Sequence, residues 1–168
     1  MNKNILYSIF LLFLAASCGP SEVEPSTNSL NYDPILMPRS EMENAIAWLP
    51  SRDLNAPGRI HVKGDTIYIN EQYKGVHVLD NRNPKNPVPL GFIRIPGNLD
   101  MAVKHHILYA DNAVDLIAID LKALPNIRVT QRVRNCFDKM RVPQGGFSTS
   151  YYSSQIPADA VVVGWRKK

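Results

Sequence analysis

The sequence predicts an all-β body made of two repeated units of about 40 residues, preceded by a short helix. Short runs rich in β-branched and aromatic residues, such as 67–69 and 76–79, alternate with turn residues such as Gly64-Asp65 and Lys74-Gly75. The same pattern returns about 40 residues later. The chain has 168 residues, 45% of them hydrophobic and 20% charged. That composition is typical of a globular protein and excludes a wholly disordered or collagen-like chain.

The first segment has the three parts of a secretory signal. Lys3 supplies a positive start, residues 5–14 are apolar except for Ser8, and the small residues 15–17 follow. The apolar run is too short for a permanent membrane-spanning helix, which needs about 20 residues. We therefore expect residues 1–17 to be a signal peptide that is absent from the mature chain.

The segment Leu14-Ala15-Ala16-Ser17-Cys18 resembles the lipobox of bacterial lipoproteins, although the large aliphatic residue stands one position early. A cysteine is suited to this place because its thiolate can form a thioether with a diacylglycerol. Several acyl chains, each contributing about 0.8 kcal/mol per buried CH₂, anchor a protein stably. We expect lipidation of Cys18, so that the first partner of the chain is a membrane reached through its N-terminal lipid.

Residues 18–38 are rich in proline, serine, threonine and asparagine, which predicts a flexible tether. Glu22 and Glu24 resemble the surface-export signal of Bacteroidetes-type lipoproteins, and a plain solvated linker is an equal alternative. Gly19, directly after the cysteine, is compatible with outer-membrane sorting. The expected location is therefore the cell envelope, as an outer-membrane lipoprotein that is either periplasmic or surface-exposed.

A short helix and linker are expected over residues 39–57. Ser40 and Glu43 have the spacing of a capping box, and Pro50 ends the pattern. Apolar residues recur between them at helical spacing (Met42, Ile46 and Leu49).

The repeat defines two units, 58–98 and 99–137, followed by a loop and a C-terminal strand in 138–168. The paired positions are Ile60, Val62, Ile67 and Tyr68 with Met101, Val103, Leu108 and Tyr109, then Val76, Leu79 and Asp80 with Leu116, Ile119 and Asp120. The offset changes from 41 to 40 between residues 70 and 75, where a turn accommodates it. About four strands in about 40 residues is typical of a propeller blade. Two β-propeller-like blades form only a partial propeller, since rings have about four to eight.

One family resembles this chain. The segment Leu116-Ile117-Ala118-Ile119-Asp120 resembles the core of LVIVD-repeat proteins, and 76–80 (VHVLD) is a looser copy followed by an Asn-Pro-x-Asn-Pro turn at 83–87. The second unit departs from that turn, with Leu-Pro-Asn-Ile at 124–127. The resemblance covers about 37–137 and implies a bacterial lipoprotein with a β-propeller-like body. Members are usually longer, so the chain looks like a short or truncated member.

The repeat positions Tyr68, Asp80, Tyr109 and Asp120 are interpreted as structural. An aspartate after a strand can accept a backbone N–H and fix a turn, and recurrence at the repeat period favours that role over catalysis. The oxygen donors Asp111, Asn112 and Asp115 form a solvated turn or, alternatively, a calcium site.

Other polar and reactive residues have structural interpretations. Adjacent His105 and His106 are expected in a polar turn, while His61 and His77 lie singly in strands. We expect Cys136 to be buried beside Phe137. The alternating basic residues Arg128, Arg132 and Arg134 are expected to form the solvated face of a strand, with contact to anionic glycans or lipid A phosphates as the alternative. No catalytic, cofactor-binding or metal-binding motif is recognised.

These observations predict a lipid-anchored binding or interaction module with a protein or glycan ligand, in which copies of the chain could complete the ring by association. A net charge of +4 with interspersed signs does not favour nucleic acid as a partner. Two alternatives stay open: part of a propeller-type enzyme acting on an envelope glycan, and a truncated product without independent function.

Overall fold

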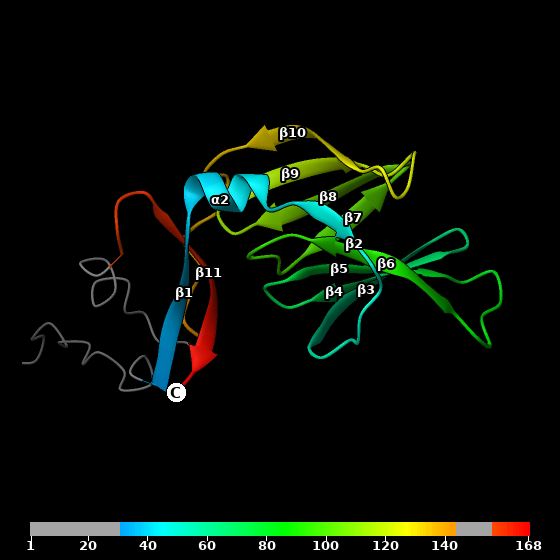
Figure 1. Cartoon of the computed structure of the whole chain (residues 1–168), viewed down its shortest axis with the longest axis horizontal. Coiled ribbons are helices and arrows are strands. Elements are labelled where there is room, and N and C mark those ends of the chain that lie inside the picture. The colour runs from blue at the N-terminus through cyan, green and yellow to red at the C-terminus, as the bar shows by residue number, and fades with distance from the viewer. Residues whose placement is uncertain (1–30, 144–155) are drawn as a thin grey trace, which may run out of the picture.

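The computed structural model describes residues 31–143 and 156–168 and consists mostly of antiparallel β-sheet (Figure 1). One sheet has the strand order β2-β6-β5-β4-β3, a second has β10-β9-β8-β7, and β1 pairs with β11 in a separate ribbon. The first sheet contains β2 (Ala47–Leu49), β3 (Pro57–Lys63), β4 (Thr66–Glu71), β5 (Gly75–Asp80) and β6 (Val88–Arg94). The second contains β7 (Met101–Lys104), β8 (Ile107–Asn112), β9 (Asp115–Asp120) and β10 (Arg128–Val133).

The two sheets share one strand register. Ile67 pairs with Leu79 in the first sheet, and their repeat partners Leu108 and Ile119 pair in the second. The connection between β4 and β5 has one residue more than that between β8 and β9, so the predicted change of offset does fall in this turn. Each sheet is thus a four-stranded meander, and β2 adds a fifth strand to the first.

A single apolar core lies between the two sheets. Each strand alternates its side chains between two faces, and one face of each sheet points toward the other sheet. The shared cluster includes Tyr68, Val76, Val78 and Ile93 from the first sheet and Met101, Val103, Leu108, Ala110, Ile117 and Ile119 from the second. Trp48 of β2 packs at its margin and fills the space beside Gly91, where a Cβ would collide with the indole.

The ribbon of β1 (Tyr32–Pro38) and β11 (Ala160–Lys167) corrects the prediction of a tether through residue 38. Proline-containing segments can form edge strands, and β1 has β11 as its only strand partner in the described chain. One face of the ribbon packs on Ala113 and Val114, at the β8–β9 turn. Its Gly164 lies against the ring of Tyr73, in the β4–β5 turn. The ribbon therefore lies across one end of both sheets (Figure 1).

The helix is shorter than predicted. Helix α2 covers Arg39–Asn44 and has no side-chain N-cap hydrogen bond, so Ser40 and Glu43 do not form the expected capping box. Residues 47–49, expected in the helix, form β2 along β6 because tertiary pairing outweighs the weak local periodicity. Met42 is fully buried against the ribbon. No helix within 31–143 or 156–168 is long and apolar enough to cross a membrane.

Candidate functional site

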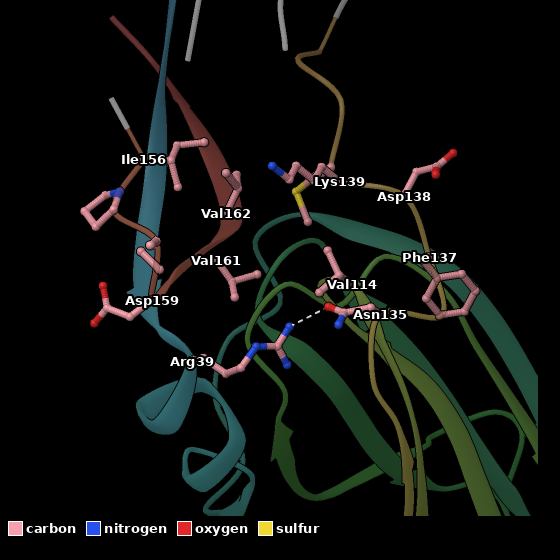
Figure 2. Close-up of a pocket in the computed structure, with 14 residues that line it drawn as sticks. Arg39, Val114, Asn135, Phe137, Asp138, Lys139, Ile156, Asp159, Val161 and Val162 are labelled. Atoms are coloured by element: carbon pink, nitrogen blue, oxygen red, sulfur yellow. Dashed lines mark hydrogen bonds between the residues drawn. The ribbon is translucent and has the colours of Figure 1, made fainter. Parts of the chain in front are cut away.

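A cleft of about 790 Å³ opens between the ribbon, the start of α2 and the segment that follows β10 (Figure 2). Its apolar lining includes Val114, Phe137, Ile156, Val161 and Val162, and its polar lining includes Arg39, Asn135, Asp138, Lys139 and Asp159. Small-molecule sites commonly have volumes of about 300–1,000 Å³ and combine apolar walls with a few polar groups. The cleft therefore has the size and mixed lining of a binding site.

The frame of the cleft is held by hydrogen bonds between segments distant in sequence. The backbone N–H of Arg39 donates to the carbonyl of Asp159 at 2.8 Å, which joins the start of α2 to the residue directly before β11. The N–H of Phe137 donates to the carbonyl of Val114 at 2.9 Å. The segment after β10 and the ribbon are thus fixed on either side of the opening.

Arg39 joins the cleft to a buried ionic cluster. Its Nη2 donates to Asn135 Oδ1 at 2.8 Å, the contact drawn in Figure 2, and its Nη1 lies 3.1 Å from Asp115 Oδ2. Asp115 is fully buried and also accepts Arg132 Nη1 at 2.7 Å and the Asn135 N–H at 3.0 Å. Asn135 and Asp115 therefore fix the orientation of the Arg39 guanidinium without the need for a ligand.

The electrostatics of this cluster keep Asp115 ionised. Burial alone would raise the pKa of Asp115, but hydrogen bonds from the Asn135 N–H, Arg132 and Arg39 outweigh burial and lower it. The alternation of basic residues predicts a solvated side chain at Arg132. Instead this side chain is only 14% exposed, because it forms an ion pair with the buried Asp115.

A second ionic cluster lies on the first sheet, at the end of β4. Glu71 is fully buried; its Oε1 accepts Arg52 Nη2 at 2.7 Å and Lys74 Nζ at 2.8 Å, while its Oε2 lies 2.8 Å from His77 Nε2. Burial raises the pKa of Glu71, but the bonds from Lys74, His77 and Arg52 more than offset this effect and bring it to about 2. The His77 ring also contacts the Phe92 ring. Arg52 Cζ lies over the Phe92 ring, 4.4 Å from its centroid. All acceptor groups here face donors within the protein, so the cluster fits a structural role.

The aspartates predicted from the repeat occupy equivalent turns. Asp80 Oδ1 accepts the N–H of Arg82 at 2.9 Å, and Asp120 Oδ1 accepts the N–H of Lys122 at 2.8 Å, which are the contacts of Asx turns. The repeated tyrosines differ: Tyr68 is buried in the core, whereas Tyr109 is 40% exposed. The structure leaves these positions apart from the cleft.

The oxygen donors at 111–115 are occupied by protein partners. Asp111 Oδ1 accepts the N–H groups of Leu99 and Asp100, at 2.8 and 3.0 Å. Asn112 donates to the carbonyl of Pro96 at 2.6 Å. Among the described residues no cluster of three or more His, Cys, Asp or Glu side chains is suited to hold a metal ion. His105 and His106 form the turn between β7 and β8.

The predictions for the two cysteines have different outcomes. Cys18 and the signal segment 1–17 lie outside the described residues. The prediction that Cys136 is buried is wrong: it is exposed, because the chain leaves β10 at Val133 and turns through Asn135, whose φ is +51°. Phe137 is likewise 44% exposed and lies at the cleft.

The residues of the cleft could not be predicted from the sequence. Arg39, Asn135, Phe137, Lys139 and Asp159 are separated by up to 120 residues in the chain and share no local pattern. Their only sequence signal was the strand at 160–165, which does not reveal its partner. No family model matches the chain, and the searches of curated proteins and of solved structures likewise return no match.

Proposed function

We propose that the chain is a lipid-anchored envelope protein whose two β-propeller-like blades carry a binding module for a glycan, with the cleft as the site. The observation that carries the proposal is the cleft itself, which is lined by the exposed Phe137 and by polar side chains from three separate segments. An aromatic face can stack on the apolar face of a sugar ring, while amide, carboxylate and cationic groups bind its hydroxyls.

The repeated register supports the interpretation as blades. Two successive four-stranded meanders with the same pairing share one core, and their first strands, β3 and β7, lie against each other. Successive propeller blades are stacked in this manner around an axis. The LVIVD-like segments at 76–80 and 116–120 form the equivalent strands β5 and β9.

The ligand proposal is tested on an array of envelope glycans with the full chain solubilised in detergent. Phe137→Ala and Lys139→Ala should each reduce binding by about tenfold or more, equivalent to about 1.4 kcal/mol. Val88→Ala is the matched control, because Val88 is an exposed apolar residue on β6 that is not part of the cleft lining. The proposal is contradicted if the wild type binds no glycan on the array, or if Phe137→Ala binds as well as the wild type.

The proposed lipid anchor at Cys18 is tested separately, by labelling with palmitate. Cys18→Ala should abolish incorporation of labelled palmitate and move the protein from the membrane fraction to the soluble fraction. Cys18 lies outside the residues that the structure describes, so circular dichroism is recorded as a check that the substitution leaves the fold unchanged. Undiminished palmitate labelling of Cys18→Ala would refute the lipid attachment.

A further inference from the structure

Each of the two sheets has one face in the shared core and one face directed away from it. In the first sheet the outward face includes Ile60, Val62, Ile67, Ile69 and Leu79, a set that we call the open face of the first sheet; cross-strand pairing places them together. Ile60 and Val62 are 65% and 55% exposed. In the second sheet the outward face includes Ala102, Tyr109, Leu116 and Val133, the open face of the second sheet. Tyr109 and Val133 are 40% and 45% exposed.

The repeat relates these open faces to the two faces that already pack together. The open face of the first sheet occupies the same repeat positions as the core face of the second sheet, so that Ile60 corresponds to Met101, Val62 to Val103 and Ile67 to Leu108. Conversely, the open face of the second sheet corresponds to the core face of the first. There, Tyr109 takes the place of Tyr68, Leu116 that of Val76 and Val133 that of Ile93.

We propose that copies of this chain associate head to tail, with the open face of the second sheet of one copy packed on the open face of the first sheet of the next. This contact continues the interface between the two sheets inside each copy. It is heterologous, since the two surfaces that meet are different.

Charge at the edge of the interface fits the same arrangement. Within one copy, Arg59 of β3 forms an ion pair with Asp100, just before β7, with Nε and Oδ1 3.1 Å apart. The two residues hold the same repeat position, 41 residues apart. In a head-to-tail assembly Asp100 of one copy therefore faces Arg59 of the next, and opposite charges again meet.

The geometry also limits the size of the assembly. A heterologous contact closes into a ring when the rotation between units allows it and otherwise forms an open filament. With two sheets in each copy, a ring of the usual four to eight blades needs about two to four copies. The open faces are separate from the cleft, so the association does not depend on the proposed ligand.

The test is sedimentation velocity of the full chain in detergent, with micelles in excess so that shared micelles do not imitate association. At about 100 µM, a concentration that detects even weak association, the wild type should sediment as two to four chains. Val62→Lys and Tyr109→Lys should each be monomeric, because each removes one of the two surfaces. Val88→Lys is the control: it places the same charge on an exposed residue outside both open faces and should leave the assembly unchanged.

Mixing the two variants separates a head-to-tail contact from a symmetric one. Val62→Lys keeps an intact second open face and Tyr109→Lys keeps an intact first one, so the mixture should form one-to-one pairs and nothing larger. A monomeric wild type, either variant assembling as the wild type does, or a mixture that stays monomeric would overturn the proposal. Circular dichroism checks that each variant is folded, and Ile60→Lys replaces Val62→Lys if that variant is not.

Discussion

Replacement of Glu71 by glutamine should lower the stability of the protein and change its response to acid. Glutamine keeps the size of the side chain but removes the negative charge that faces Arg52 and Lys74, and its amide places an N–H group against donors. The pKa of Glu71 is about 2, compared with 4.5 for a free glutamate. At about 1.36 kcal/mol per pKa unit, this difference sets an upper limit of about 3.4 kcal/mol on the stabilisation.

The expected loss is smaller than this limit. The side chains of Arg52 and Lys74 are 38% and 50% exposed, so that water screens their charges. We therefore expect Glu71→Gln to reduce the free energy of unfolding by about 2 kcal/mol at pH 7. Urea titration followed by fluorescence of the two tryptophans measures this quantity.

The pH dependence identifies the charge as the cause. A carboxyl whose pKa is lower in the folded state stabilises the fold above its unfolded pKa and loses that contribution as the pH falls through its folded pKa. The difference between wild type and Glu71→Gln should therefore be constant above about pH 4.5 and shrink between 4.5 and about 2. Exposed Glu41→Gln is the control and should show no such change. An equal difference at pH 7 and pH 2.5 would refute the reasoning.

Two further substitutions test the backbone of the repeats. Gly75 has φ +141° and an added Cβ would collide with the carbonyl of Ile93, so Gly75→Ala should lower the free energy of unfolding by about 3 kcal/mol or prevent folding. Gly64 has φ +55° and open space around it, so Gly64→Ala should lower it by only about 1 kcal/mol. Urea titration measures both changes. Asp120→Ala should lower the free energy of unfolding by about 1 kcal/mol, while Asp120→Asn, which keeps an acceptor for the Lys122 N–H, should lose little; equal losses in the two variants would show that the turn contact is not the cause.

The two meanders could be predicted because their information is local. Alternating apolar residues and glycine-containing turns specify each hairpin, and the offset between units located the turn with an extra residue. The contact between Glu71 and His77 could also have been predicted from the sequence. In the β4–β5 hairpin Ile69 pairs with His77 and Glu71 with Gly75, which makes Glu71 and His77 diagonal neighbours on one face.

The ribbon and the cleft depend on non-local contacts and were not predicted. Residues 32–38 contain two prolines and have the composition of a linker. They form a strand because they pair with β11, which lies more than 100 residues later in the chain. Three residues at 47–49 are too few to show an alternation of their own. Arg39 has no local feature that indicates Asp115, 76 residues later in the chain. Pairings of this kind are decided by the folded body as a whole.

The pairing of β1 with β11 also bears on the order in which the protein folds. Tyr32 pairs with Lys167, so this contact closes a loop of most of the chain, whereas each hairpin of the two meanders joins neighbouring strands. Hairpins form in about 1–10 µs, and a contact across so long a loop forms only after the intervening sheets have compacted it. The ribbon should close last and open first, so its amides should exchange hydrogen sooner than those of β5 and β9. Since β11 contributes a wall of the cleft, the kinetics of this opening and of ligand entry should be linked.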